Sequence, residues 1–138
     1  MNREKAINLL ESYFDDGTFF KDLSRRVAIE TESQNPDKIS KLYQYLSHEI
    51  TPYLNEIGFD CKIYENPDIT FNGPFLFSKR IEDNNLPTVL LYGHGDVVRG
   101  NKKEWRKGLN PWKVKKEGNR LYGRGTADNK GQHTINLA

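Results

Sequence analysis

The hydrophobic period of this 138-residue chain changes at Gly58. Before Gly58, apolar residues recur every three or four positions, as on the buried side of α-helices. After it, apolar and polar residues alternate, as on half-buried β-strands. The expected helices are residues 3–15, 20–27 and 39–57, and the first expected strands are residues 59–63 and 75–77. Pro52 predicts a kink or a new start in the longest helix, because proline lacks the N–H donor and clashes with the preceding turn.

The later part of the chain adds an apolar run, a hairpin and a helix. Thr88–Tyr92 is a continuous apolar run, which is typical of a central strand buried on both faces. The segments 112–116 and 120–122 predict a hairpin, and helical spacing resumes at Gly131. Helices first, and then strands with a helix behind them, predict an α/β layer structure.

Composition and cysteine usage exclude several classes of protein. Hydrophobic residues make up 36% of the chain and charged residues 29%, which is typical of a soluble globular protein. No apolar run approaches the ~20 residues that a membrane-spanning helix needs, and the N-terminus lacks the features of a secretory signal. Cys61 is the only cysteine and is expected to pack in a strand. We therefore expect a cytoplasmic protein with no membrane partner.

The formal net charge of +2 conceals a strongly basic segment, residues 99–120, with nine Lys or Arg against two Glu. The segment also holds Trp105 and Trp112, and basic residues interleaved with aromatic ones can bind single-stranded nucleic acid. A single-stranded nucleic-acid-binding module is therefore the alternative from a different functional class. Basic hairpins are usually solvated surfaces, so we expect an exposed arm here and no nucleic acid among the partners.

The first candidate for chemistry is Gly93-His94-Gly95-Asp96, which follows directly after the apolar run. Ligand sites of open α/β sheets lie beyond the carboxyl ends of strands. Residues two apart in an extended chain point to the same side, so Asp96 can accept the second ring N–H of His94. The other nitrogen of His94 is then available for a metal or a proton. A hydrogen-bonded histidine in a turn is an equally good interpretation of this motif alone.

The second candidate is Asp128, in the glycine-framed segment 122–131 between the expected hairpin and the last helix. Glycine permits tight turns and close approach of the backbone. The order of Lys130 and Gly131 is the reverse of a phosphate-binding P-loop. Taken alone, Asp128 is best interpreted as the N-cap of the last helix. Together, a carboxylate-backed histidine and a second carboxylate indicate nitrogen and oxygen ligands, which suit zinc, cobalt or manganese.

The wording HGDVV, then GLNPW, then LYGRGTADNKGQ resembles the zinc-dependent aminoacylase, carboxypeptidase G and succinyl-diaminopimelate desuccinylase superfamily, which includes carnosine-type dipeptidases. The specific match covers residues 88–138. The resemblance implies that His94 is a metal ligand, and that Asp96 orients and polarises His94 and is counted as catalytic. It also implies that Asp128 bridges two divalent metals and that the Asp128–Asn129 peptide bond is cis. The implied reaction is hydrolysis of an amide bond in an N-acyl amino acid or short peptide, with two divalent metals, most simply zinc.

The resemblance further implies parts that these 138 residues do not contain. Such enzymes use a consecutive Glu-Glu pair as general base and metal ligand, and this chain has no Glu-Glu. A catalytic zinc needs about three protein ligands. We therefore expect residues 1–138 to be the N-terminal part of a zinc exopeptidase catalytic domain of the phosphorylase/hydrolase-like kind, with a mixed sheet flanked by helices. This piece is expected to lack a dimerisation domain and to be inactive alone, and the full-length form is expected to be a homodimer. His48 and His133 are expected in surface or packing roles.

Overall fold

The computed structural model describes residues 2–68 and 73–138. Its α-helices and strands are α1 (Arg3–Asp15), α2 (Thr18–Ala28), α3 (Ile39–Gln44), α4 (Thr51–Glu56), β1 (Asp60–Glu65), β2 (Pro74–Lys79), β3 (Lys115–Glu117), β4 (Arg120–Tyr122) and α5 (Lys130–Asn136). A π-helical segment, Tyr45–Ile50, joins α3 to α4, and Pro36–Lys38 and Lys102–Glu104 are short 3₁₀ turns. The expected helices, the expected strands around Cys61 and Phe75, and the expected hairpin are therefore confirmed, although β3 is shorter than the expected segment 112–116.

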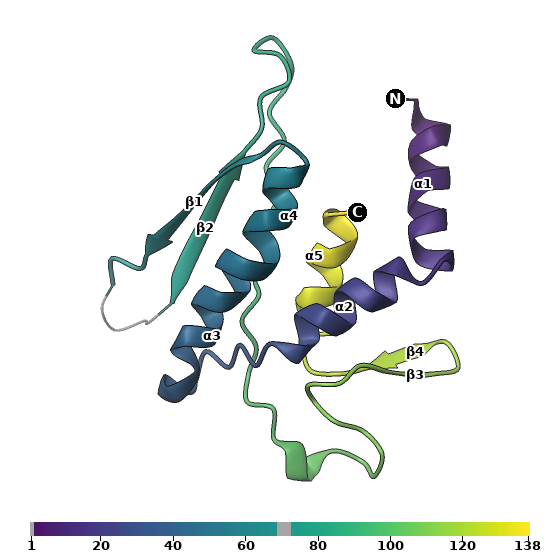
Figure 1. Ribbon diagram of the computed structural model, residues 1–138, viewed down its shortest axis with the longest axis vertical. Coiled ribbons are helices and arrows are strands. Elements are labelled where there is room, and N and C mark those ends of the chain that lie inside the picture. Colours follow the sequence, from purple (N-terminus) through teal and green to yellow (C-terminus); the bar gives the residue numbers. More distant parts are fainter. Residues whose placement is uncertain (1, 69–72) are drawn as a thin grey trace.

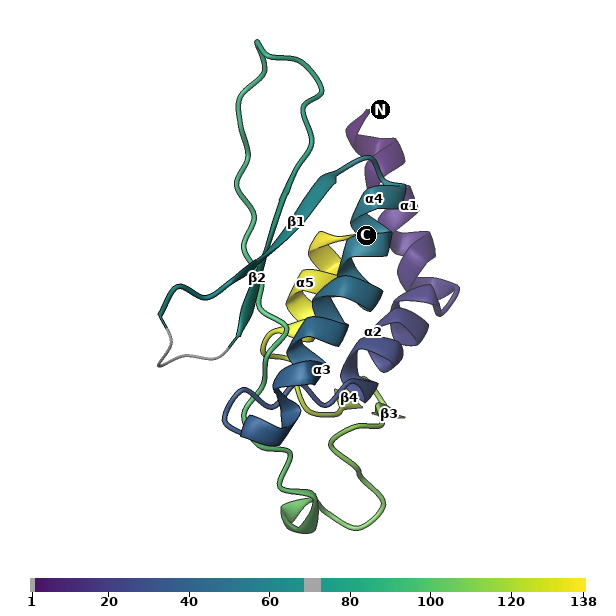
Figure 2. The ribbon, with the colours of Figure 1, turned by 60° about the vertical axis from the view of Figure 1, so that its left-hand side comes forward.

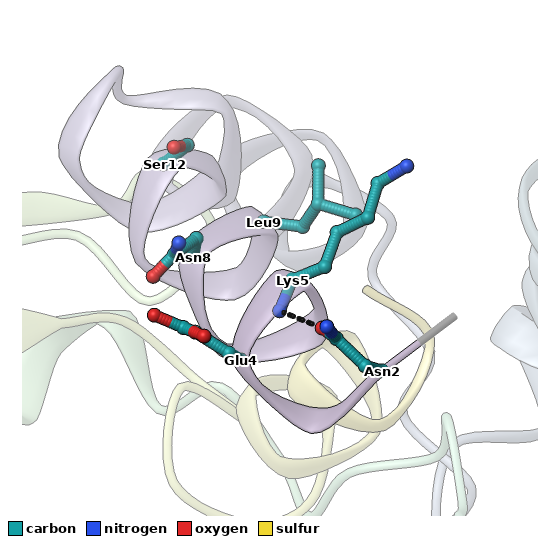
Figure 3. A pocket seen from close by; sticks show the side chains of 6 residues that line it. All are labelled: Asn2, Glu4, Lys5, Asn8, Leu9 and Ser12. Atoms are coloured by element: carbon teal, nitrogen blue, oxygen red, sulfur yellow. Dashed lines mark hydrogen bonds between the residues drawn. The ribbon is translucent and has the colours of Figure 1, made fainter.

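Helix α1 shows how local sequence sets a helix start. The side chain of Asn2 accepts a hydrogen bond from the Lys5 amide at 2.9 Å, which satisfies one of the free donors of the first turn (Figure 3). Gly17, with φ +83°, separates α1 from α2 in a conformation that glycine adopts without strain. The shallow depression drawn in Figure 3 lies along α1 and includes none of the expected site residues. Among the described helices, none combines the length and the apolar character needed to cross a membrane.

The expected long helix is present as one rod built from α3, the π-helical segment and α4 (Figure 1). Pro52 lies in the first turn of α4, so the change of helical register falls just before it. This confirms the expected new start at Pro52. The π-helical segment buries Tyr45 and Glu49 against the rest of the molecule. Glu49 accepts hydrogen bonds from Arg25 Nε at 2.7 Å and from Arg26 Nε at 3.3 Å, and these contacts join the rod to α2.

The β1–β2 hairpin packs on the rod, and helix α5 packs on α2 (Figures 1 and 2). Strands β1 and β2 are antiparallel, with Cys61 opposite Ser78 and Ile63 opposite Leu76, and these four side chains are half-buried. Two small apolar clusters hold the layers together. One is centred on Phe19, Leu23, Val27 and Val114, and the other on Tyr45, Ile50 and Leu54.

The expectation of a buried central strand at Thr88–Tyr92 is wrong for the described part of the chain. The segment is extended but joins neither of the two antiparallel strand pairs. Its apolar side chains are exposed, with Leu90 at 88% and Tyr92 at 80%. A continuous apolar run becomes a buried strand only where strands and helices cover its edges and faces, and residues 2–68 and 73–138 place none there. The residues that follow the run, beginning with Gly93 and His94, belong to the site described next.

Candidate metal centre

His94 lies at the end of this extended segment, with its ring half-buried between two carboxylates. Its Nδ1 is 3.1 Å from Oδ1 of Asp96 and 3.1 Å from the main-chain oxygen of the same residue. Its Nε2 is 3.0 Å from Oδ1 of Asp128, which comes from the loop between β4 and α5. The three residues predicted from the sequence are thus brought together, although Asp128 is 34 residues from His94.

Asp128 occupies a tight loop rather than the helix-capping position. The N-cap of α5 is Asn129, so the interpretation of Asp128 as a simple N-cap is wrong. The Asp128–Asn129 peptide bond is cis, as the resemblance implied. A Cβ on Gly131 would lie 1.9 Å from the main-chain oxygen of Thr126, so only glycine fits where α5 begins. The side chain of Asp128 is 83% exposed, which leaves its carboxylate open to a ligand from solvent.

Both ring nitrogens of His94 face a carboxylate, which can only accept, so a neutral ring donates its single proton to one side or the other. Nδ1 faces two acceptors of Asp96, its Oδ1 and its main-chain oxygen, which favours the proton on Nδ1 and leaves the lone pair on Nε2. That lone pair points at a second acceptor, Oδ1 of Asp128, 3.0 Å away. Two acceptors at this separation repel one another unless a proton or a metal cation lies between them. An imidazole nitrogen and a carboxylate oxygen are also the ligands that zinc takes at about 2.0–2.2 Å, so His94 and Asp128 fit a divalent cation.

The main chain around His94 is fixed from the α2 side. The hydroxyl of Thr31, which is fully buried, donates to the main-chain oxygen of Gly95 at 2.5 Å. The amide of Val97 donates to the main-chain oxygen of Thr31 at 2.9 Å, and Val97 forms a parallel bridge with Glu32. The loop after the apolar run is therefore held by a short parallel pairing with residues 31–33. The sequence analysis assigned these residues no role.

Two buried aromatic rings lie directly against the glycines on either side of His94. A Cβ on Gly95 would lie 2.3 Å from a ring carbon of Tyr45, and a Cβ on Gly93 would lie 2.8 Å from Cβ of His133. His133 was expected only in a surface or packing role and Tyr45 was not singled out, and the structure places both beside the glycines that flank His94. The signal that could have identified them is the glycine on each side of a ligand histidine, since it marks a close neighbour on both sides.

Lys130 is a further residue that the sequence analysis did not single out. Its side chain is fully buried, and Nζ donates to the main-chain oxygens of Arg26 at 2.9 Å and Ile29 at 2.7 Å, at the carboxyl end of α2. The ammonium also lies 4.9 Å from the ring centre of Tyr45. Burial lowers the pKa of Lys130 to about 7, and the charges of Asp96 and Glu49 oppose this shift. Lys130 therefore holds the loop of Asp128 against α2.

The two tryptophans of the basic segment 99–120 contact other residues of the same chain. Trp105 donates its indole N–H to the main-chain oxygen of Gly100 at 2.7 Å, and the guanidinium of Arg124 lies over its ring. Trp112 lies against Gly100, where a Cβ would come within 2.5 Å of its ring. Both tryptophans are half-buried, and the exposed charge of the segment lies on its Lys and Arg side chains.

Cys61 is half-buried in β1, as expected, and burial raises the pKa of its thiol. His48 is exposed on the rod and contacts Ser47. Within residues 2–68 and 73–138, no group of three or more His, Cys, Asp or Glu side chains converges as a complete metal site. His94 and Asp128 are therefore two candidate ligands, with Asp96 behind the first.

Comparison with known proteins confirms the resemblance. Residues 90–138, which include His94, Asp96 and Asp128, match the model of peptidase family M20/M25/M40. The M20 metallohydrolase superfamily is thus the class to which the motifs and fold of this chain point. The chain is 30% identical to the Beta-Ala-His dipeptidase of Mus musculus over 93% of its own length, and 27% identical to the cysteinylglycine-S-conjugate dipeptidase of Corynebacterium striatum over 86%. It spans only 27% and 25% of those two relatives.

Solved structures support the same conclusion about the fold. The chain matches human carnosine dipeptidase 1 with a TM-score of 0.83 and 25% identity, over 96% of this chain and 29% of that one. It matches the dipeptidase Dug1p of Saccharomyces cerevisiae with a TM-score of 0.74 and 25% identity, over 93% of this chain and 29% of that one. The expected α/β class is confirmed, and the described residues correspond to less than a third of either structure.

Proposed function

We propose that the protein containing this chain hydrolyses the amide bond of short peptides, dipeptides first among them, or of N-acyl amino acids, with bound divalent metal. One observation carries the proposal: Nε2 of His94 and Oδ1 of Asp128 lie 3.0 Å apart while Asp96 occupies the other ring nitrogen. Both relatives described above are dipeptidases, which supports the substrate class.

The residues of this chain would divide the work as follows. His94 and Asp128 would hold the cation, and the exposed second oxygen of Asp128 would reach a second cation. When bound, such cations polarise a carbonyl group and lower the pKa of a water molecule. Asp96 would keep His94 in the Nδ1–H form and turn Nε2 outward. We propose zinc as the cation because the ligands are imidazole and carboxylate.

A complete site needs further groups. Two ligands are fewer than the three that a catalytic zinc ordinarily takes, and the 138 residues contain no Glu-Glu pair to act as general base and ligand. We propose that segments outside residues 1–138 supply them, and that these 138 residues alone are inactive. The relatives, of which this chain covers about a quarter, leave ample length for such segments.

The test uses the full-length protein and compares the wild type with His94→Gln, Asp128→Asn and, as a matched control, His48→Gln. The wild type and the control should bind divalent metal and hydrolyse dipeptides or N-acyl amino acids, and a chelator should abolish hydrolysis. The two site variants should lose both properties. Hydrolysis that survives chelation or the His94 substitution would refute the proposal. Binding of oligonucleotides that weakens steeply with salt, without any hydrolysis, would favour the nucleic-acid alternative instead.

A further inference from the structure

Behind the candidate metal centre, a line of buried polar groups runs from the rod to the main chain of His94. The hydroxyl of Tyr45 lies 2.5 Å from Nε2 of His133, and Nδ1 of His133 lies 3.3 Å from Oδ1 of Asn129. The same Asn129 oxygen accepts the His94 amide N–H at 3.2 Å. Tyr45 is 1% exposed and His133 8%, so water has little access to either ring. The line therefore connects the π-helical segment, α5 and the metal loop.

For a neutral His133 ring, only one assignment of protons satisfies every contact in this line. Asn129 Oδ1 must accept, because the His94 amide can only donate. His133 Nδ1 must then donate to the same oxygen, which leaves Nε2 of His133 as the acceptor for the Tyr45 hydroxyl. Burial raises the pKa of Tyr45, so its hydroxyl keeps the proton that it donates. Burial, assisted by the charge of Arg26, lowers the pKa of His133 to about 4, so its ring is neutral near pH 7.

The same two rings support the loop sterically. Gly93 and Gly95 leave no room for a Cβ, since His133 and Tyr45 lie within 2.8 Å and 2.3 Å of its place. The backbone on both sides of His94 therefore packs directly against these two residues. Asn129, which follows Asp128 in the chain, accepts a hydrogen bond from the His94 amide. Both proposed ligands are thus attached to one buried support.

We propose that His133, held by Tyr45 in its Nδ1–H form, is a positioning residue that sets the distance and direction between the ligands His94 and Asp128. His133 touches neither the metal nor the substrate in this scheme and acts through Asn129 and the main chain of His94. The part that concerns metal affinity rests on the proposed function, while the tautomer and the protection of the His94 amide do not.

The first test examines metal-free full-length protein at pH 7 by NMR. The ring nitrogens of His133 should report the Nδ1–H tautomer, and the amide of His94 should be protected from hydrogen exchange. Tyr45→Phe keeps the ring beneath Gly95 and should let His133 exchange tautomers, while His133→Leu should speed exchange at His94 by about tenfold. An Nε2–H tautomer in the wild type, or unchanged exchange at His94 in His133→Leu, would overturn the proposal.

The second test measures Co²⁺ affinity and the Co²⁺ absorption spectrum in full-length variants that retain wild-type thermal unfolding. His133→Asn keeps a donor at the Nδ1 position and should stay within about threefold of the wild-type affinity. His133→Gln keeps only the acceptor facing Tyr45, and its Co²⁺ affinity should fall by about tenfold with an altered Co²⁺ absorption spectrum. A loss of this size is typical when a hydrogen bond that supports a ligand is removed. Better binding by the Gln variant than by the Asn variant would overturn the proposal. A wild type that binds no Co²⁺ would refute the proposed function instead, and the NMR test would still decide the role of His133.

Discussion

The buried histidine makes the stability of this fold sensitive to mild acid. His133 is a base whose pKa is lowered to about 4 in the folded protein, from an ordinary value of 6.5, first by burial and then by the positive charges of Arg26 and Lys130. As pH falls below 6.5, the unfolded chain takes up a proton that the folded chain resists until about pH 4. The free energy of unfolding therefore decreases as pH falls through this window. At pH 5 the loss relative to pH 7.5 amounts to about 2 kcal/mol, worked from the two pKa values.

The assay is urea unfolding followed by circular dichroism at pH 7.5, 6 and 5, on the wild type and on His133→Asn. The variant has no titrating ring at this position, so its free energy of unfolding should fall by about 2 kcal/mol less than that of the wild type between pH 7.5 and 5. His48→Asn removes an exposed histidine and should keep the wild-type slope. Carboxylates also contribute to acid sensitivity, but they do so equally in all three proteins. Glu32 is one example: its pKa lies below the usual value despite partial burial, because the Gly100 amide donates a hydrogen bond to it. Equal acid sensitivity of the wild type and His133→Asn would refute the reasoning.

Three further predictions concern the site and the surface. Asp128→Ala in the full-length protein should remove bound metal, whereas Asp96→Ala should retain much of the metal and slow turnover. Equal metal loss in the two variants, measured by elemental analysis, would contradict this division of roles. Gly95→Ala should lower the free energy of unfolding by about 1–3 kcal/mol, because the methyl group overlaps a buried ring, while Gly73→Ala, whose Cβ meets only an ordinary contact, should change it little in the same thermal scan. Glu117→Gln breaks two exposed ion pairs and should leave the unfolding midpoint unchanged in a salt series; a clear shift would show that the pairs matter.

Local patterns were sufficient to predict most elements of this fold. The ends of helix α1 were predictable because capping and positive φ are properties of single residues. Asn2 caps its N-terminus, and Gly17, with positive φ, follows its C-terminus. The alternation around Cys61 predicted a strand because one face of β1 packs on the rod. The run at Thr88–Tyr92 misled the same reasoning, because burial of a strand depends on neighbours that its own residues do not specify.

The site could be predicted only in part. His94 and Asp96 are two residues apart, so extended geometry alone brings them together, and the resemblance then gave the candidate Asp128 its role as a bridging ligand. Tyr45 and His133 are 88 residues apart, and nothing local indicates that one hydroxyl meets the other ring. Lys130 resembles a surface residue by composition, yet it is buried with its Nζ donating to two main-chain carbonyls at the end of α2.

The exposed run Thr88–Tyr92 has a consequence for any preparation of these 138 residues alone. Its residues favour β-structure, carry no charge and include no proline, and its edges pair with no strand among the described residues. Such a ribbon is a template for intermolecular pairing and slow aggregation. The same five residues that lead into His94 would then join one molecule to the next.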